Sequence, residues 1–360
     1  MADFKDEFSP ALVDHLGAEI GRAWPGFPRE EWRTRALDGL DELRLLERVA
    51  HLSRVLGDLL PPSFPDAAAV LHEALRSETL DGWMTLPCGW MVADRGIDEP
   101  EVALPLLAAL SPRFSSEGTV RPFIRRHPEI TYGYLREWAS DPDHEVRRLV
   151  SECTRPRLPW APQLPTHIAD PQLGIVFLDM LFDDPSEYVR RSVANHLNDI
   201  SKDHREVALE CARRWGAAST RGEFVVRHGL RTLVKRGDPE ALGLLGYAHG
   251  NLVTLDAIDC APAVVAIGEQ VTLTAVLSVD EPTRAAIDYV VHYQGATGLK
   301  AGKVFKLTSR DLRPGHPETI VRRHRFRHVS IRTIRPGRHR IEIQVNGRVL
   351  GGCDIEVVEG

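Results

Sequence analysis

Apolar residues recur with helical spacing in two matching segments near the middle of the chain. Residues 141–148 and 184–191 share the pattern Asp-Pro-x-x-x-Val-Arg-Arg, and the second copy begins 43 residues after the first. Each copy carries an apolar stripe at i, i+3, i+4 or i, i+4, i+8 spacing, which is helical. The stripes are Val146, Leu149, Val150 and Cys153 in the first copy and Val189, Val193, Leu197 and Ile200 in the second. We expect two helices, each with its Asp as N-cap and its Pro in the first turn.

A 43-residue period is typical of HEAT and armadillo repeats, in which helix pairs stack on one another. Helical spacing also runs through residues 1–110, where it predicts one long amphipathic helix over 37–56 and tryptophans that pack between helices. A further helix is expected over 224–236. The sequence therefore predicts a HEAT-like α-α superhelix as a first domain, residues 1–250.

The pattern changes near residue 251, where short β-rich runs alternate with turns that contain Pro and Gly. About seven runs in about 105 residues are typical of an immunoglobulin-like β-sandwich. We therefore expect a second domain, residues 251–360, and a fold of the α + β class with two domains. The expected strands cover 253–258, 271–279, 287–293, 304–307, 319–326, 339–345 and 349–358.

Polar residues occupy the face opposite each apolar stripe. One interpretation is a solvated face with salt bridges between neighbouring helical turns. The other is a site, because carboxylates weaken a purely electrostatic grip on an anion. An arginine row with embedded acids suits a site that holds a polyanion while acting on a cation. The residues are Arg148, Glu152 and Arg155 in the first copy and Arg191, Asn195 and Asp199 in the second.

Two further features lie close to these helices in the sequence. Glu117 shares a helical face with Arg121 and Arg125, and it is either a first-turn acid stabilised by the helix dipole or part of the same site. Trp160 stands in a loop, residues 155–162, whose prolines restrict the backbone on both sides. Its indole either carries function or anchors the loop in the core.

Charge is strongly segregated within an overall net charge of −6. Residues 1–112 carry 10 Lys and Arg against 20 Asp and Glu, whereas residues 282–348 carry 15 against 4. The basic segment is either a nucleic-acid-binding surface or a partner for the acidic third of the same chain. Arg323 and Arg325 lie two residues apart in an expected strand, so they should project from one face of the sheet.

Composition narrows the remaining possibilities. The 360 residues, 43% of them hydrophobic, can form a large core and two domains. The five cysteines are widely spaced without a Cys-x-x-Cys pattern, which favours free thiols. The sequence contains no metal-ligand motif, P-loop or dinucleotide fingerprint, so we expect no metal and no cofactor. It also lacks a signal-peptide pattern and a membrane-spanning run, so we expect no membrane contact and a cytoplasmic location.

Five segments together resemble the AlkC branch of the HEAT-repeat alkylpurine DNA glycosylases. The resemblance covers residues 111–250, and some members of that branch also end in an immunoglobulin-like domain. The segments are Ser-Ser-Glu-Gly-Thr-Val-Arg-Pro-Phe (115–123), Val-Arg-Arg-Leu-Val-Ser-Glu (146–152), Arg-Pro-Arg-Leu-Pro-Trp (155–160), Tyr-Val-Arg-Arg-Ser-Val-Ala-Asn-His-Leu-Asn-Asp-Ile-Ser-Lys (188–202) and His-Gly-Leu-Arg-Thr-Leu-Val-Lys-Arg-Gly-Asp-Pro-Glu-Ala-Leu (228–242).

The resemblance implies base excision repair, in which the N-glycosidic bond of a cationic N-alkylated base such as 3-methyladenine is hydrolysed in duplex DNA without a lyase step. It places the catalytic acids at Glu117, Glu152 and Asp199 and the backbone-facing tryptophan at Trp160. A cationic base leaves without protonation, so the remaining tasks are to stabilise an oxocarbenium-like sugar and to place a water, and carboxylates suit both. We expect Glu152 and Asp199 to face the deoxyribose and Glu117 to support the base or the water.

We expect the phosphates of alkylated double-stranded DNA to be held by cations of the helical region and of one strand. The protein should act as a monomer, associated with the nucleoid in a bacterium. The alternative is a non-enzymatic HEAT-repeat scaffold that binds an acidic protein partner or damaged DNA. The predicted DNA-binding cations are Arg148, Arg155, Arg191, Lys202, Arg231, Lys235, Arg323 and Arg325.

Overall fold

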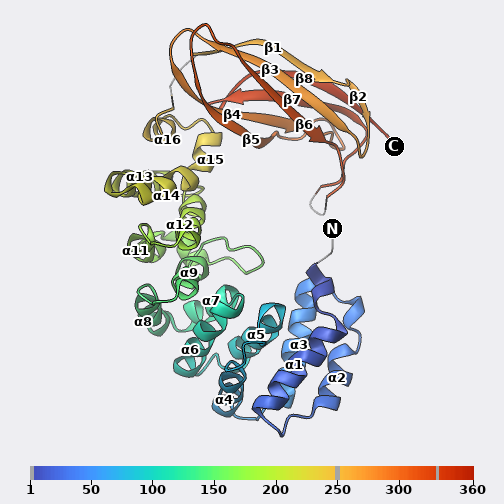
Figure 1. Ribbon diagram of the computed structural model, residues 1–360, viewed down its shortest axis with the longest axis vertical. Helices are drawn as coiled ribbons and strands as arrows, with labels where there is room; N and C mark the ends of the chain where they lie inside the picture. The colour runs from blue at the N-terminus through green and yellow to red at the C-terminus, as the bar shows by residue number, and fades with distance from the viewer. Residues whose placement is uncertain (1–3, 248–251, 330–331) are drawn as a thin grey trace. The chain divides into compact units, whose positions relative to one another are not determined.

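The computed structural model describes residues 4–247, 252–329 and 332–360. Helices come first along the chain and strands follow, as predicted (Figure 1). Within the described part, no helix has both the length and the apolar character needed to cross a membrane. The α-helices are α1 (Pro10–Ala23), α2 (Arg29–Leu37), α3 (Leu45–Leu59), α4 (Phe64–Ala74), α5 (Thr85–Arg95), α6 (Pro100–Leu110), α7 (Glu117–Arg126), α8 (Pro128–Trp138), α9 (His144–Cys153), α10 (Pro165–Ala169), α11 (Gln172–Leu181), α12 (Glu187–Ile200), α13 (Arg205–Ala218), α14 (Thr220–Gly229), α15 (Arg231–Lys235) and α16 (Pro239–Leu244). Short 3-10 helices are η1 (Phe4–Glu7), η2 (Leu40–Glu42), η3 (Gly82–Met84) and η4 (Ser111–Arg113).

The chain packs as two compact units. The first contains the described residues up to Asp203 together with Trp215–Val225, and the second contains His204–Arg214 and the described residues from Val226 onward. This division by packing differs from the boundary expected near residue 250, which was based on the change of sequence pattern. That boundary stays a prediction.

The two copies of the repeated motif form equivalent structures. Both apolar stripes are buried, as their spacing predicts. The expected N-caps are wrong by two residues: the Asp141 and Asp184 side chains each accept a 2.8 Å hydrogen bond from the backbone N–H two residues later, and α9 and α12 begin only after these turns. Arg147 of the first copy donates to Asp184 of the second at 2.6 and 3.0 Å, so the turn also joins one repeat to the next.

Two expected helices are each divided in the structure. The pattern over 37–56 spans the end of α2, η2 and most of α3, because Gly39 takes a left-handed φ of 67° that stops the first helix. The pattern over 224–236 is divided into α14 and α15 at Leu230. In both cases the apolar spacing continues although the helix is interrupted, because the helix on each side of the interruption buries its own apolar face.

Within the second unit, the strands form two sheets that enclose one apolar core. A three-stranded sheet has the order β1-β3-β6 and a five-stranded sheet the order β2-β8-β7-β4-β5. All seven expected strands are present, and the short parallel strand β2 was not predicted. The strands are β1 (Val253–Ala261), β2 (Val264–Ala266), β3 (Gln270–Val279), β4 (Thr283–His292), β5 (Lys303–Leu312), β6 (Glu318–Arg325), β7 (Gly337–Val345) and β8 (Arg348–Val358).

The last helices pack against the five-stranded sheet inside the second unit. Gln344 of β7 donates a 2.9 Å hydrogen bond to the Lys235 carbonyl, and the Tyr247 hydroxyl lies 3.1 Å from the Ser309 hydroxyl. Gly237 and Gly347 both take positive φ, and a Cβ on Gly347 would lie 2.0 Å from the Gly237 Cα. Glycine is therefore required where the chain after α15 meets the turn between β7 and β8.

Candidate functional site

A cleft of about 410 Å³ opens in the first unit where α9 meets the loop after it. Acidic, basic and aromatic side chains line it together, a combination that can bind a charged aromatic group. It brings together Glu117, Glu152, Trp160, Arg148 and Arg155, five residues predicted from the sequence. The other lining residues are Leu46, Val49, Leu86, Trp90, Ser115, Ser116, Gly118, Thr119, Leu158, Pro159, Ala161 and Asn195.

Glu117 is the first residue of α7 and is buried. One carboxylate oxygen accepts from the Ser115 hydroxyl and the other from Arg148 of α9. Arg121 and Arg125, which the spacing placed on the same helical face, instead turn to the loop that contains Trp160. Tyr188 completes the arrangement, since its ring lies 4.5 Å from the Arg148 guanidinium. Arg148 is therefore fixed between a carboxylate and an aromatic face.

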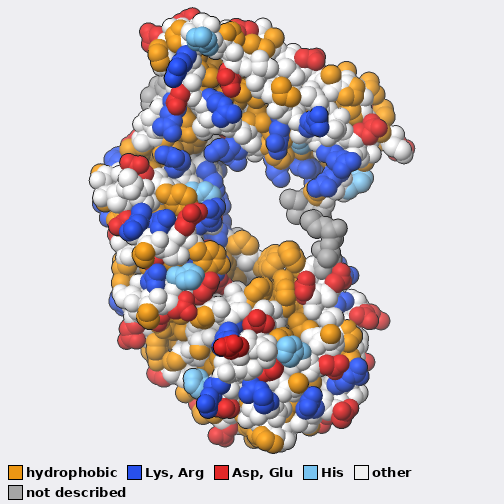
Figure 2. All heavy atoms as spheres, viewed as in Figure 1, with side chains coloured by type: hydrophobic (Ala, Val, Ile, Leu, Met, Phe, Trp, Pro, Cys, Tyr) orange, Lys and Arg blue, Asp and Glu red, His pale blue; other side chains and the backbone are white. Residues whose placement is uncertain are grey.

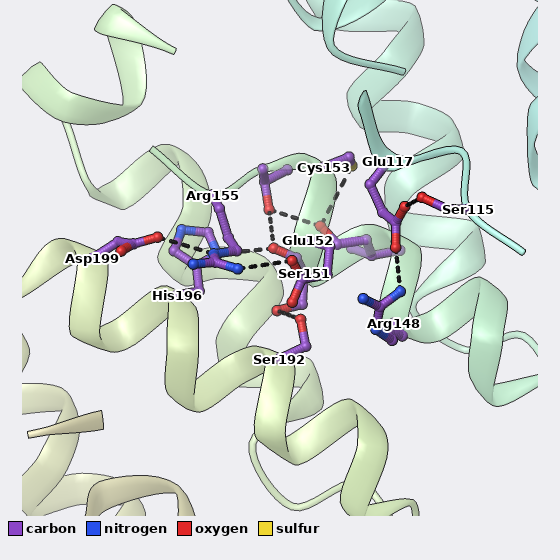
Figure 3. A network of polar contacts seen from close by, with 12 residues as sticks. Ser115, Glu117, Arg148, Ser151, Glu152, Cys153, Arg155, Ser192, His196 and Asp199 are labelled. Atoms are coloured by element: carbon purple, nitrogen blue, oxygen red, sulfur yellow. Dashed lines mark hydrogen bonds and ion pairs between the residues drawn. The ribbon is translucent and has the colours of Figure 1, made fainter. Parts of the chain in front are cut away.

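Glu152 and Asp199 lie on either side of Arg155. The Arg155 guanidinium donates to Glu152 through Nη1 and to Asp199 through Nε, each at 2.9 Å, and Lys202 Nζ donates to Asp199 at 2.8 Å. Figure 3 shows Arg155 between the two carboxylates, with Glu117 and Arg148 on the other side of Glu152. Glu152 lines the cleft, whereas Asp199 is 2% exposed and is not among the lining residues.

Negative and positive side chains are equal in number in this network. Burial alone would lower the pKa of Arg155, but the Glu152 and Asp199 carboxylates outweigh it and raise that pKa. The pKa of Arg148 is likewise raised, because Glu117 and Glu152 outweigh the effect of its burial. The three acids thus sit among three cations, Arg148, Arg155 and Lys202. This near-neutral arrangement can hold carboxylates in their charged form inside a cleft.

Hydrogen bonds behind the cleft fix α9 against α12. The Ser192 hydroxyl of α12 donates to the Ser151 hydroxyl of α9 at 2.8 Å. His196 donates from Nδ1 to the Ser151 carbonyl at 3.1 Å, and burial lowers the pKa of His196 well below its usual value, so the ring is neutral. Figure 3 shows Ser151, Ser192 and His196 beside the acids. The helices that carry Glu152 and Asp199 are therefore joined by polar contacts as well as by apolar packing.

Trp160 stands at the tip of a tightly held loop. Its side chain is largely exposed and its φ is 60°, so it does not anchor the loop in the core. The loop is held at its base by Arg121, a fully buried residue of α7 that donates to the carbonyls of Cys153, Arg155 and Pro162 at 2.7–3.0 Å. Arg125 adds a bond to the Gln163 carbonyl. The loop presents an exposed indole on a constrained backbone.

The other predicted DNA-binding cations lie outside the cleft. Arg191 is exposed and pairs with Glu187 at 2.6 Å on its own helix. Arg231 and Lys235 line a small pocket of the second unit, of about 40 Å³, together with Lys306 and Asp288. Arg323 and Arg325 are exposed on β6, opposite Thr272 and Gln270 of β3, and so share the outer face of the three-stranded sheet as predicted.

Two polar or aromatic residues that line the cleft, Ser115 and Trp90, and a residue that contacts Arg148, Tyr188, were not predicted as site residues. Ser115 gave no signal, because a serine before a helix is common. Trp90 was expected to pack between helices, yet it lines the cleft. Tyr188 is the second residue of α12 and comes directly before the second Val-Arg-Arg, and the position of its ring over Arg148 depends on how α12 packs against α9. An aromatic residue two positions before the repeated Arg-Arg pair was the available signal, and it is a weak one.

Comparisons with known proteins agree along the whole chain. Residues 254–359 match the family model of the C-terminal Ig-like domain of the uncharacterised protein YhaZ. The chain is 30% identical over 358 residues to "Uncharacterized protein YhaZ" of Bacillus subtilis (strain 168), a match that covers 99% of this chain and 100% of that protein. It is also similar to the structure of Pseudomonas fluorescens alkylpurine DNA glycosylase AlkC bound to DNA containing an abasic site analog, with a TM-score of 0.93, 33% identity, and coverage of 99% and 100% of the two chains. The chain therefore belongs to the AlkC family of alkylpurine DNA glycosylases.

Proposed function

We propose that this alkylpurine DNA glycosylase hydrolyses the N-glycosidic bond of cationic N-alkylated bases, such as 3-methyladenine, in duplex DNA. The observation that carries the proposal is the cleft in which Glu117 and Glu152 lie beside an exposed Trp160. In this proposal the Trp160 indole contacts the DNA backbone. A DNA substrate is supported by family membership and by the DNA bound to the Pseudomonas relative. The base takes the electron pair of the broken bond and leaves uncharged, water supplies the new hydroxyl on the sugar, and the other proton of the water is released.

The chemistry fits the charges of the site. A base alkylated on a ring nitrogen is already a cation, so its departure needs no general acid. As the bond breaks, positive charge moves to the sugar, and a nearby carboxylate stabilises it. Glu117 and Glu152 each accept hydrogen bonds from an arginine, which keeps their negative charge in place without a free cation at the cleft surface.

The positions of the three acids suggest different roles. Glu152 lines the cleft and is our candidate for the acid that faces the deoxyribose, while Glu117 faces the base or the water. The sequence predicted that Asp199 would face the sugar with Glu152. Asp199 lies across Arg155 from the cleft, so we propose that it acts by holding Arg155, and through it Glu152. Arg155, buried between two acids, suits that positioning role more than contact with a phosphate.

Contact with DNA phosphates falls to the more exposed cations in this proposal. Arg191 and Lys202 lie on or just after α12, which also supplies Asp199. Arg148, like Arg155, is paired with a buried acid at the cleft, so it suits positioning of Glu117 more than contact with a phosphate. Arg231, Lys235, Arg323 and Arg325 would add contacts from the second unit. A monomer with no metal and no cofactor, acting on nucleoid DNA in the cytoplasm, remains part of the proposal.

The test is release of free bases from methylated genomic DNA, with the products separated by chromatography. We expect the full-length protein to release 3-methyladenine. Glu152→Gln and Glu117→Gln keep the side-chain shape but remove the charge, and each should lower the rate by about 100-fold or more, as loss of an electrostatic stabiliser does elsewhere. Affinity for undamaged duplex should change less than twofold, because the phosphate-binding cations remain.

Glu101→Gln, an exposed acid of α6, serves as the matched control and should keep the full rate. If the unaltered protein releases no alkylated base, the proposed activity is wrong. If it releases base and both cleft variants do so at its rate, the assignment of the acids is wrong while the activity stands.

A further inference from the structure

The ring of Phe4 contacts the Trp160 indole, which the proposed function places against DNA. Phe4 is the first residue of η1, and its ring centroid lies 5.9 Å from that of Trp160 at an interplanar angle of 68°, an edge-to-face arrangement. Phe4 also lies 5.6 Å from Trp83, which in turn lies 5.7 Å from the fully buried Phe8. A row of rings therefore connects the exposed indole to the core of the first unit.

Trp160 needs such a support because few other contacts fix the orientation of its side chain. Trp160 is 61% exposed, so little packing selects one side-chain rotamer. Its φ of 60° lies in the left-handed region, which a bulky residue adopts only when neighbouring structure holds it there. Arg121 and Arg125 hold the base of the loop and leave the orientation of the indole unspecified.

The contact with Phe4 can supply this orientation. Edge-to-face aromatic pairs favour one geometry over others by about two- to tenfold in population. Phe4 is itself 55% exposed, so an apolar ring remains at the surface. Both the exposure of Phe4 and its edge-to-face contact are explained if its ring orients the Trp160 indole.

We propose that Phe4 is a positioning residue for base excision, which acts by holding the Trp160 indole in the orientation that meets DNA. The proposal rests on the proposed function, in which Trp160 contacts the DNA. It assigns a role in the reaction to the acidic N-terminal third, whose surface charge does not favour contact with phosphates.

The test is a double-mutant cycle with full-length Phe4→Ala, Trp160→Ala and the double variant. Single-turnover excision at saturating enzyme measures the maximal rate, and fluorescence anisotropy measures affinity for undamaged duplex. We expect Phe4→Ala to lower the maximal rate by about two- to tenfold, with an affinity change below twofold and an unchanged melting temperature. Because Phe4 acts through Trp160, the double variant should be no slower than Trp160→Ala alone.

Two further variants separate positioning from a general structural effect. Phe4→Tyr keeps the ring and should restore the rate, whereas Met180→Ala removes a similarly exposed apolar side chain from α11 and should leave the rate unchanged. The proposal would be overturned if the double variant were slower than Trp160→Ala by the factor that Phe4→Ala alone loses. It would also be overturned if Phe4→Ala kept the full maximal rate. If the unaltered protein excises no base, the proposed function fails instead, which is a distinguishable result.

Discussion

At the scale of single residues, the acids of the site are held by arginines from other parts of the chain. The helical spacing predicted that acids and arginines would share a face, which is correct. It did not predict the partners, because Glu117 pairs with Arg148 and Asp199 with Arg155, across 31 and 44 residues. Long guanidinium side chains reach between packed helices, and sequence spacing carries no information on that packing. The interpretation as a solvated face is wrong for these acids, since they are buried.

Asp288 is a buried acid outside the cleft, and its environment predicts a dependence of stability on pH. It lies on β4, lines the small pocket with Lys235 and Lys306, and is buried. Burial raises its pKa from 3.8 to about 6, although the two lysines oppose the shift. The folded state therefore binds this proton more tightly than the unfolded state. Its contribution to stability is present below about pH 4 and is lost as pH rises through about 6.

Asp288→Asn removes this titration, so the comparison isolates the residue. A shift of about two units corresponds to about 3 kcal/mol as an upper value. Relative to the unaltered protein, the Asn variant should gain up to about 3 kcal/mol in free energy of unfolding between pH 4 and pH 7. Urea denaturation of both proteins across that range measures the difference. A difference that stays constant with pH would show that Asp288 titrates normally in the folded protein.

At the scale of elements, the loop with Trp160 depends on a residue whose role the sequence did not indicate. The spacing placed Arg121 on the face of α7 that carries Glu117. In the structure Arg121 is 1% exposed and burial lowers its pKa to about 10, because the proline-rich loop covers it and takes its hydrogen bonds. Spacing indicates that two residues share a face, but only the path of a distant loop decides whether that face is buried.

Replacement of Arg121 by Met should therefore loosen the loop. The buried carbonyls of Cys153 and Arg155 would lose their donor, at about 1–3 kcal/mol each, and the more exposed Pro162 carbonyl would lose its donor at a smaller cost, so we expect a loss of several kcal/mol in the free energy of unfolding. The loop should become sensitive to proteolysis, and excision should fall with it. Arg125→Met is the matched control on the same helix, because that exposed side chain makes one bond to the loop. Thermal melts and limited proteolysis of both variants test this, and equal stability of the two would contradict it.

The strands illustrate what local pattern can predict. Seven runs of alternating or β-branched residues were identified, and each is a strand of the second unit. The strand β2 was missed because it has three residues, too few for an alternation, and it forms by parallel pairing with β8 at the far end of the domain. The register of Arg323 and Arg325 was predictable, since alternate residues of a strand share a face. Similarly, the buried stripes of α9 and α12 were predictable, but their N-caps were not.

At the scale of the whole molecule, the arginines of the basic strand region fall into two groups, which differ in whether they pair with acids. Arg338 and Arg340 of β7 pair with Asp354 and Glu342 at 2.7–3.3 Å, so the five-stranded sheet neutralises its own arginines. Arg323 and Arg325 of β6, by contrast, form no ion pair with an acid in the part of the chain that the structure describes. In Figure 2, Lys and Arg side chains gather over the part of the sandwich that contains β6. Charge counts alone did not distinguish these two groups of arginines.

The last prediction follows from this difference and uses the salt dependence of DNA binding. A cation that contacts a phosphate releases counterions, and the slope of log Kd against log salt concentration changes by about 0.9 for each contact. If Arg323 and Arg325 contact DNA, the Arg323→Ala/Arg325→Ala double variant should show a slope shallower by about two and a weaker affinity at low salt. The Arg338→Ala/Arg340→Ala double variant removes the same formal charge from arginines that are already neutralised, so its slope should stay close to that of the unaltered protein. Anisotropy titrations of all three proteins with one undamaged duplex, at four or more salt concentrations, make the comparison. If the slope of log Kd against log salt concentration becomes shallower by the same amount in both double variants, the sandwich acts on DNA through its net charge alone. In that case β6 has no specific contact with the phosphates.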